Sequence, residues 1–567
     1  MHSTKKGENI MAIIGIDLGT TNSLAVCWKN GKKIMIKNSL GDIYTPSAVS
    51  IDEKGEVLVG KAAAQRLISH PGCTVSEFKR YMGTNRKYKL GENEYSPEEL
   101  SSFVLRKIKQ DAEAFLGEPV EEAIISVPAY FDDNCRNATK LAAKLSGLNV
   151  ERLINEPSAA ALAYIEKNKF EDGTYMIVDF GGGTLDISVV DTFDGVIEIL
   201  AVSGDNQLGG KDFNNAIVKY FCDENGLDES TLSPESRAII YKNAEQCKMA
   251  LTDSPMTVMI SNIDGKQYSA VLDNNRLIKI SADIFNKISF PIKKALHDSR
   301  CSVDDIEEII LVGGSCHMPV VKAFIEKLMN RSPENCINPD TAIAIGAGIF
   351  GGIKARNNEL KDIILTDICP YSLGISVYET KTNEELMEFL IPRNTSLPAS
   401  RVNIFNAIKD DQERVHIKIY QGESMLPAKN LFLGELEVQC PKTKKDEIIC
   451  SVRLTYDING ILVVDVVTND NKNYSKTILS KRNQMTDEQI SECIKKLEAL
   501  KISPFDEEEN RLLISRAEAL YEEALPDERE IIKEYLLRFK RTLQTNNKHE
   551  IRNAYSILEK MIDEWGF

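Results

Sequence analysis

Apolar positions in residues 11–360 alternate between short strand-like runs and longer helical stretches. This alternation is typical of an α/β architecture, in which helices cover the faces of a sheet of buried strands. The pattern changes in residues 368–480, where Val415, Ile417 and Ile419 fall on one face of a strand and polar residues alternate with them. Period-two alternation predicts half-buried strands, so we expect an antiparallel β-domain in this region.

Residues 485–567 form a third region, which is charged and follows the helical period without strand signals. Apolar residues share a helical face in two places: Ile532, Tyr535, Leu536, Phe539 and Leu543, and then Ile551, Ala554, Tyr555, Leu558 and Ile562. Two or more amphipathic helices of this kind indicate an appendage and not a third catalytic unit.

A short apolar run bracketed by acids, residues 362–367, joins the first two regions, and Asp367 ends it. Its apolar residues are Ile363, Ile364 and Leu365, and it lacks the Gly and Ser of a passive tether. Two interpretations remain open for it. The run is either the first strand of the β-domain or a linker that docks on the first region in one state and leaves it in another.

The composition is that of a globular protein, with 43% hydrophobic and 27% charged residues. A formal net charge of −16 lacks the basic footprint of a nucleic-acid or anionic-membrane binder. No apolar run approaches the ~20 residues that span a bilayer, and Gly15 and Asp17 interrupt the first run too early for a secretory leader. The 12 cysteines include no Cys-x-x-Cys pair, as expected of free thiols in a reducing compartment. We therefore expect a cytoplasmic protein without nucleic-acid or membrane partners.

Two segments of the first region share one order of elements, which indicates an internal duplication. Residues 11–37 contain an apolar strand, the loop Asp17-Leu18-Gly19-Thr20-Thr21-Asn22, a second strand, a tight turn and a third strand. Residues 175–202 repeat this order around Asp179-Phe180-Gly181-Gly182-Gly183-Thr184. We expect two similar lobes, each presenting a Gly/Thr hairpin to a shared cleft.

The residue types in these hairpin loops suit a bound phosphate chain. Glycine lets a backbone N–H approach a phosphate oxygen without a Cβ in the way, and threonine hydroxyls add donors. The aspartate that ends each first strand supplies the hard oxygen ligand that Mg²⁺ prefers, directly or through water. One such motif alone is usually an ordinary turn, but two at matched positions predict loops that hold phosphates from opposite sides.

The segment from Gly204 to Asp212 looks like a P-loop but does not meet its requirements. Asp212 stands where the motif needs Ser or Thr for Mg²⁺, and the glycine spacing is off by one. We therefore expect no Walker A site here, although Gly209 and Gly210 still permit close backbone approach to a ribose or phosphate.

Several motifs in register resemble the 70-kDa heat-shock chaperones of the DnaK type, in order from about residue 12 to about residue 480. The matching segments are Gly15-Ile16-Asp17-Leu18-Gly19-Thr20-Thr21-Asn22-Ser23, Val127-Pro128-Ala129-Tyr130-Phe131, Asn155-Glu156-Pro157-Ser158-Ala159-Ala160-Ala161, Asp179-Phe180-Gly181-Gly182-Gly183-Thr184-Leu185-Asp186, Leu311-Val312-Gly313-Gly314-Ser315, Asn338-Pro339-Asp340 and Ala344-Ile345-Gly346-Ala347. The helical tail is shorter than is usual in the family, so the chain looks most like the short bacterial HscC-like branch.

The resemblance implies an α/β actin-like two-lobed ATPase domain over residues 1–361 and an interdomain linker over 362–367. An antiparallel β-sandwich peptide-binding domain over 368–484 and a short α-helical lid over 485–567 follow. It implies a monomeric ATP-dependent chaperone that binds and releases extended hydrophobic segments, with ATP hydrolysis coupled allosterically to peptide affinity. The implied cofactors are ATP or ADP, Mg²⁺ and K⁺, and the implied partners are unfolded client polypeptides, a J-domain co-chaperone and a nucleotide-exchange factor.

The resemblance also implies roles for single residues. Lys79 matches the catalytic lysine that orients the attacking water, and Glu156 matches the acid placed near that water. Without the resemblance, the sequence would predict an ordinary surface lysine at Lys79 and a turn residue at Glu156. Asp17, Asp179 and Asp186 match the acids around Mg²⁺ and K⁺. The other matches on the phosphate side are Gly19, Thr20, Thr21, Asn22, Gly181, Gly182, Gly183 and Thr184, of which Thr184, with Asp179, is also expected to be catalytic.

The adenosine side of the expected site comes from three segments. Glu245, Lys248 and Thr252 share one helical face and match the nucleoside-contacting face, although spacing alone predicts a solvated charged stripe. Gly313, Gly314, Ser315 and Asp340 match the adenosine-side loops. His317 replaces an arginine that stacks on adenine in the family, and Met249 forms the other wall. Histidine stacks without a permanent charge, so we expect weaker ATP binding than is usual in the family.

In the β-domain, Phe405, Val415 and Ile417 match hydrophobic positions of a peptide groove, with Val415 at the central pocket. Spacing alone is equally compatible with ordinary sandwich core. Met387 and Ile408 align with the arch over the peptide, and Ile408 is bulkier than the residue usual there. Such a groove accepts one Leu- or Ile-sized side chain, while backbone hydrogen bonds tolerate many sequences.

Three further residues match sites that connect the two domains. Pro128 and Arg136 match the family's coupling switch, and Arg152 lies where a J-domain partner would contact the chain. Two other functions fit an actin-like ATPase. A small-molecule kinase leaves residues 368–567 unexplained, and a filament-forming or scaffolding ATPase would polymerise with ATP.

Overall fold

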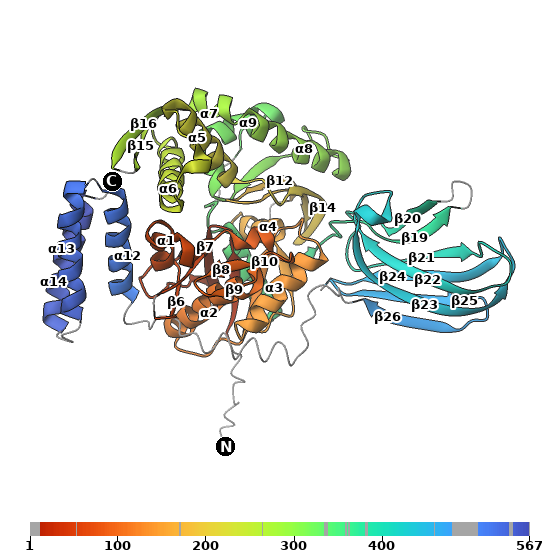
Figure 1. Cartoon of the computed structure of the whole chain (residues 1–567). Helices are drawn as coiled ribbons and strands as arrows, with labels where there is room; N and C mark the ends of the chain where they lie inside the picture. The colour runs from red at the N-terminus through yellow and green to blue at the C-terminus, as the bar shows by residue number, and fades with distance from the viewer. Residues whose placement is uncertain are drawn as a thin grey trace, which may run out of the picture.

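The computed structural model describes residues 12–565 except 53, 169–171, 264, 334–337, 358–359, 361–362, 380–383, 459, 479–507, 525 and 544–547. A two-lobed α/β region lies in the middle, a β-sandwich lies at one end and three helices lie at the other (Figure 1). Residue 362 of the predicted linker and much of residues 485–567 lie outside the described part. Within that part, no helix is both long and apolar enough to cross a membrane.

The first lobe is built on a mixed sheet with strand order β11-β10-β1-β2-β3, in which β1 pairs antiparallel with β2 and parallel with β10. Its strands are β1 (Ile13–Leu18), β2 (Asn22–Lys29), β3 (Lys32–Met35), β4 (Thr45–Pro46), β5 (Ala48–Ile51), β6 (Val57–Val59), β7 (Thr74–Ser76), β8 (Tyr88–Leu90), β9 (Asn93–Tyr95), β10 (Glu122–Val127) and β11 (Leu153–Asn155). Its helices are α1 (Lys61–Ser69), α2 (Pro97–Leu116), α3 (Asp133–Leu145), η1 (Pro71–Cys73) and η2 (Phe78–Tyr81).

The second lobe repeats this plan, with strand order β17-β12-β13-β14-β18 and a parallel β17 beside β12. Its strands are β12 (Gly173–Phe180), β13 (Leu185–Phe193), β14 (Val196–Asp205), β15 (Met256–Ile263), β16 (Lys266–Asp273), β17 (Glu308–Val312) and β18 (Ile364–Thr366). Its helices are α5 (Gly210–Asn225), α6 (Pro234–Ala250), α7 (Asn274–Ile280), α8 (Ala282–Ser299), α9 (Pro319–Met329), η3 (Glu229–Thr231) and η4 (Gly314–His317). The two three-stranded meanders confirm the duplication inferred from the sequence.

Two helices, α4 (Glu156–Lys167) and α10 (Ala342–Lys354), fill the space between the two sheets. They cross closely because α10 is rich in glycine: a Cβ on Gly346 would lie 1.8 Å from the carbonyl oxygen of Ala159. One apolar cluster joins these helices to strands of both sheets, including Ile154 of β11 and Ile177 of β12. The hairpin loops of both lobes are therefore held at one shared cleft.

The β-domain is a sandwich of two antiparallel four-stranded sheets, ordered β20-β19-β22-β23 and β21-β24-β25-β26. The strands are β19 (Leu373–Glu379), β20 (Glu384–Ile391), β21 (Ala399–Asn406), β22 (Gln412–Gln421), β23 (Leu431–Thr443), β24 (Ile448–Tyr456), β25 (Leu462–Thr468) and β26 (Asn473–Ile478), with η5 (Pro427–Lys429) in the connection between β22 and β23. Period two in β22 turns Ile417 and Ile419 into the core, whereas His416 and Lys418 pair with acids on the outer face.

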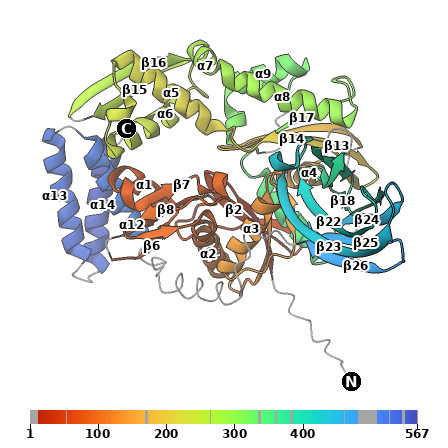
Figure 2. The ribbon, with the colours of Figure 1, turned by 45° about the vertical axis from the view of Figure 1, so that its right-hand side comes forward.

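The described C-terminal helices form an antiparallel bundle of α12 (Glu508–Glu523), α13 (Pro526–Leu543) and α14 (Lys548–Trp565). The predicted apolar stripes meet in its core, where Ile532, Phe539, Leu558 and Ile562 are buried. The bundle packs on the two-lobed region at the end opposite the β-sandwich, in both views of the molecule (Figures 1 and 2).

Candidate functional site

A cavity of ≈ 470 Å³ lies between the two lobes, and both hairpin loops reach it. It is lined by every residue predicted for catalysis or for the nucleotide except Gly183, Gly209 and Gly210, and by every predicted metal ligand except Asp186. Segments that are far apart in the chain therefore converge on one site. A volume of this size suits a drug-sized or cofactor-sized ligand.

Glycine is required both within the first loop and where the two loops approach each other. A Cβ on Gly19 would lie 2.1 Å from the carbonyl oxygen of Asn22, and one on Gly182 would lie 2.2 Å from Oγ1 of Thr21. Gly183 and Gly209 pack backbone to backbone, since a Cβ on Gly209 would lie 2.4 Å from the Gly183 nitrogen. Neither glycine lines the cavity surface, and their contact with the nucleotide stays a prediction.

Gly210 also lies behind the loop, where its N–H donates to the carbonyl of Gly181 at 3.0 Å. The neighbouring Lys211 N–H donates to the carbonyl of Gly182 at 2.9 Å. The N-terminus of α5 therefore braces the phosphate loop of the second lobe instead of lining the cavity.

Buried charges gather at the bottom of the cavity. Lys79 Nζ donates to Glu156 Oε1 at 2.7 Å, and both side chains are almost fully buried. Burial opposes the charge of Lys79, but the negative Glu156 and Asp17 raise its pKa. Desolvation and the charge of Glu156 raise the pKa of Asp17 to about 7 and that of Asp179 well above its ordinary value. The nearby Lys79 ammonium lowers both pKa values but does not cancel the effects of burial and of Glu156.

Asp186 lies just outside the cavity surface, 1% exposed, and its Oδ1 accepts the N–H of Tyr130 at 3.2 Å. Burial raises its pKa to about 7. The other oxygens, Oδ2 of Asp179 and Oδ2 of Asp186, are buried without a hydrogen-bond partner among the described residues. Unpaired buried carboxylate oxygens beside a phosphate-sized cradle fit a divalent cation.

The donor set favours a cation that keeps part of its water shell. Among the described residues, no three acidic, histidine or cysteine side chains converge closely enough to bind one ion directly. Mg²⁺ commonly keeps several waters and binds through one or two carboxylates and substrate phosphates. Asp17, Asp179 and Asp186 would hold it in this way.

The opposite wall of the cavity comes from α6 and η4. Glu245, Lys248 and Met249 lie at the end of α6. Thr252 does not share that helix as predicted, because α6 ends at Ala250, but the following turn brings it to the same cavity. Lys248 Nζ donates to the Gly210 carbonyl at 3.1 Å, and burial lowers its pKa to about 8.

The η4 segment carries the remaining predicted wall. Gly313 adopts φ 83°, and Ser315 Oγ donates to the Gly181 carbonyl at 2.7 Å, which ties η4 to the phosphate loop. His317 Nε2 and Asp340 Oδ2 lie 3.0 Å apart, and both side chains are partly exposed. The histidine at the predicted arginine position is therefore held by an acid at the mouth of the cavity.

Sequence reasoning missed some lining residues, notably Leu24, Tyr44 and Ile343. Leu24 and Ile343 belong to apolar runs that predict core positions. Tyr44 lies between strands in a segment without a motif. No signal in the chain distinguishes these residues from their neighbours, because only the packing of the lobes places them at the cavity.

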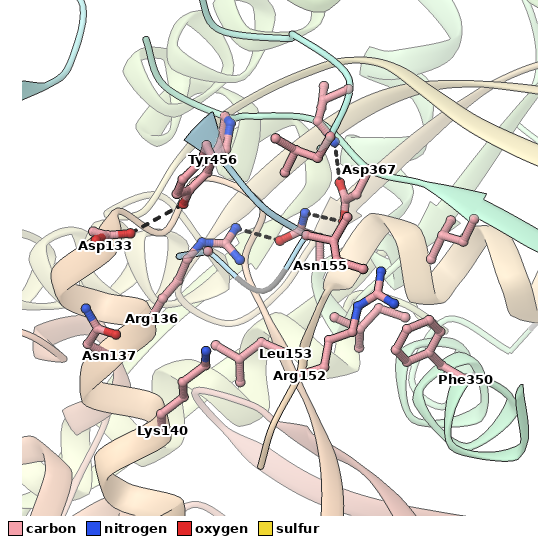
Figure 3. A pocket seen from close by; sticks show the side chains of 17 residues that line it. Asp133, Arg136, Asn137, Lys140, Arg152, Leu153, Asn155, Phe350, Asp367 and Tyr456 are labelled. Atoms are coloured by element: carbon pink, nitrogen blue, oxygen red, sulfur yellow. Dashed lines mark hydrogen bonds between the residues drawn. The ribbon is translucent and has the colours of Figure 1, made fainter. Parts of the chain in front are cut away.

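A second, small cavity of ≈ 40 Å³ lies where the lobes meet the β-domain (Figure 3). Arg136 Nη2 donates to Asn155 Oδ1 at 2.6 Å, and Asn155 Nδ2 donates to Asp367 Oδ2 at 2.7 Å. Asn155 immediately precedes Glu156, the acid at the bottom of the large cavity. A continuous chain of hydrogen bonds therefore leads from Glu156's own segment to residue 367.

The other predicted coupling residues surround this series of hydrogen bonds. Pro128 directly follows β10 and begins the next turn, and Arg136 Nη2 donates to the carbonyl of the following residue, Ala129, at 3.2 Å. Arg152 stacks on Phe350 of α10 with its guanidinium carbon 4.6 Å from the ring centre, and both line the small cavity. Burial lowers the pKa of Arg152.

The apolar run between the regions joins the second lobe. As β18 it pairs in parallel with β14, with Ile364 opposite Val196 and Leu365 opposite Ile197. Ile363 is buried in the apolar cluster between the sheets, and Ile364 is 57% exposed. The run is therefore an edge strand of the lobe and not the first strand of the β-domain.

Comparison with known proteins decides the family. The family model described as "Hsp70 protein" matches residues 13–90 and 85–565. A curated relative, "Chaperone protein DnaK" of Thermotoga neapolitana, is 36% identical over 501 residues, which cover 85% of this chain and 82% of that protein.

The chain belongs to the Hsp70 family.

Family membership confirms the predicted fold class and general function. The chain has the Hsp70 fold, with α/β nucleotide-binding lobes, antiparallel β sheets for substrate binding and C-terminal helices. It is an Hsp70-type ATP-dependent chaperone with ATPase activity, and it binds ATP or ADP and client polypeptides. The kinase and filament interpretations are set aside.

In this Hsp70 the predicted peptide-groove residues lie mainly within the sandwich. Ile417 is 2% exposed in the core, and Phe405 and Val415 are partly buried against it. Met387 lies inside β20, opposite Ser376, and is 8% exposed, and its place in an arch over the peptide stays a prediction. Ile408 follows β21 and is 42% exposed.

Polar contacts hold the β-domain on the lobes. Arg393 forms two hydrogen bonds with the carboxylate of Asp298 at the end of α8, at 2.8 and 2.9 Å. Gln421, at the end of β22, accepts the N–H of Asp133 at 3.0 Å, and Tyr456 donates to the Asp133 carboxylate at 3.3 Å. Burial raises the pKa of Asp133 to about 6.

Proposed function

We propose that ATP hydrolysis between the lobes controls how tightly the β-domain holds an extended hydrophobic peptide segment, and that residues 363–367 transmit the change. The observation that carries this proposal is the hydrogen-bonded chain from Arg136 through Asn155 to Asp367 beside the docked strand β18. Glu156 lies at the N-terminus of α4, and a shift of this end of the helix reaches Asp367 through the side chain of Asn155. A coupling free energy of ~1–3 kcal/mol changes peptide affinity about 5- to 150-fold.

The proposed roles in hydrolysis follow from the buried charges. Lys79 orients the attacking water and stabilises charge on the γ-phosphate, and Glu156 positions that water or accepts its proton. The Gly181–Thr184 loop and the Gly19–Asn22 loop hold the phosphates through N–H and hydroxyl donors. Asp17, Asp179 and Asp186 would hold Mg²⁺ and K⁺, which would neutralise charge on the phosphates. Glu245, Lys248, Ser315 and His317 hold the nucleoside.

We further propose the domain division 1–361, 362–367, 368–484 and 485–567, with the last segment acting as a short helical lid. Val415 forms the central peptide pocket between Phe405 and Ile417, with Met387 and Ile408 over the peptide. The half-buried position of Val415 against the sandwich core supports this, since a modest opening of the sheet would expose an apolar pocket.

The proposed partners are a J-domain co-chaperone at Arg152, a nucleotide-exchange factor and unfolded clients in the cytoplasm, with the active chain monomeric. We also propose that the chain belongs to the HscC-like branch of the family. Arg152 supports the partner site because it lies beside both Asp367 and the small interdomain cavity.

The test is steady-state ATP hydrolysis with and without a short Leu-rich unfolded peptide. We expect the peptide to stimulate hydrolysis in the wild type and not in Val415→Phe, which fills the proposed pocket. Val467→Phe, on the outer face of β25, is the matched control and should keep the stimulation. Hydrolysis that ignores every peptide, or equal stimulation in Val415→Phe, would contradict the coupling of these two sites.

A further inference from the structure

Helix α12 binds the first lobe through charged side chains. Lys107, which is 5% exposed on α2, donates to Glu508 Oε2 at 2.6 Å. Arg511 pairs with Asp52 at 3.1 Å and also with Glu56. These pairs lie at the start of α12, and they fix that end of the helix to the sheet edge and to α2.

The other end of α12 reaches the second lobe. Glu523 pairs with Lys242 of α6, and its backbone carbonyl accepts from Asn262 Nδ2 of β15 at 2.8 Å. Between the two ends, Ala519 is buried in one apolar cluster with Ile68 of α1 and Ile239 of α6. One face of α12 therefore touches both lobes at once.

This bridge bears directly on the large cavity, because α6 contributes to both. Ile239 and Lys242 face α12, whereas Lys248 and Met249, on the last turns of the same helix, line the cavity. The other wall belongs to the first lobe, through Thr20 and Lys79. The lobes cannot move apart at α6 unless α12 gives up its contacts with one of them.

We propose that the docked C-terminal bundle is a clamp across the two lobes that slows nucleotide release. The clamp rests on the proposed function in one respect, namely that the nucleotide occupies the cavity between the lobes. Its contacts include ion pairs that are partly exposed, such as Lys242–Glu523, and these weaken at high salt. Linkage makes the effect reciprocal: a state of the lobes that releases nucleotide also releases the bundle.

The experiment measures release of a fluorescent ADP analogue after mixing with excess unlabelled ADP, in the full-length chain. Lys242→Glu and Glu523→Lys each place like charges at the second-lobe end of α12, and we expect about tenfold faster release from each. The double variant restores opposite charges and should return within about twofold of the wild type. Lys533→Glu is the matched control, because Lys533 pairs with Glu530 inside α13 and both are well exposed.

The outcomes separate the two levels of inference. If the wild type binds the analogue and all variants release it at the wild-type rate, the clamp is wrong and the nucleotide site stands. If both single variants release faster but the double variant does not recover, the effect is not this contact and the clamp is again wrong. If the wild type binds no analogue, the nucleotide site proposed above fails and the clamp fails with it.

Discussion

Replacing Lys79 by alanine tests whether this lysine has a catalytic or a purely structural role. In Lys79→Ala, Glu156 loses its partner at 2.7 Å and remains buried near Asp17 and Asp179. Removing one preorganised donor aimed at developing charge costs about 10²- to 10³-fold in rate, or about 2.7–4 kcal/mol. We therefore expect single-turnover ATP hydrolysis to fall at least 100-fold.

The same change has a stability cost that the assay must separate. Removing one partner of a buried ion pair lowers the free energy of unfolding by about 3–5 kcal/mol. In Lys79→Ala, several neighbouring buried carboxyls would lose their positive partner. Urea unfolding measures this loss, and saturating nucleotide offsets it if binding survives. Lys33→Ala is the matched control, since Lys33 pairs with Glu166 near the surface.

The readout is hydrolysis of prebound ATP, with affinity measured separately by fluorescent-nucleotide titration. A folded Lys79→Ala protein that hydrolyses ATP within about threefold of the wild type would refute the assignment. A variant that hydrolyses normally once saturated but binds far more weakly would show that Lys79 holds the ground state. Lys79→Arg should keep the fold and lose most of the rate, because its planar fork cannot occupy the same position.

Three further outcomes are expected. His317→Arg should raise nucleotide affinity about tenfold in a titration, because a permanent cation beside Asp340 can stack on the base; unchanged affinity would contradict this. Asp367→Ala removes the acceptor of Asn155 and should abolish peptide stimulation while basal hydrolysis stays within about twofold, as a steady-state assay with and without peptide will check. Asp133, whose pKa is raised to about 6 when docked, binds more protons docked than free. The equilibrium constant for docking of the β-domain should therefore rise up to about tenfold as the pH falls from 7 to 5. Interdomain energy transfer measures this docking, and Asp133→Asn should remove its pH dependence.

Local pattern was sufficient wherever a residue's role depends on its own element. Alternation placed Ile417 and Ile419 in the sandwich core because side chains in a strand change face at every residue. The two hairpin loops were recognisable because close backbone approach demands glycine, whatever the lobes do around them. Where helix length mattered, the pattern failed: Thr252 fits the face of α6 in spacing, but the helix ends before it.

The sequence by itself determined the elements, the duplication, the loop chemistry and the family, since each is written in short stretches of residue types. Only the tertiary structure decided which surfaces meet. Tyr456 donates a hydrogen bond to Asp133, and Lys107 donates one to Glu508. The partners are 323 and 401 residues apart in the chain. Such contacts depend on the packing of whole domains, in which many weak interactions over long separations are satisfied together. No spacing in the chain records that α12 would bind both lobes.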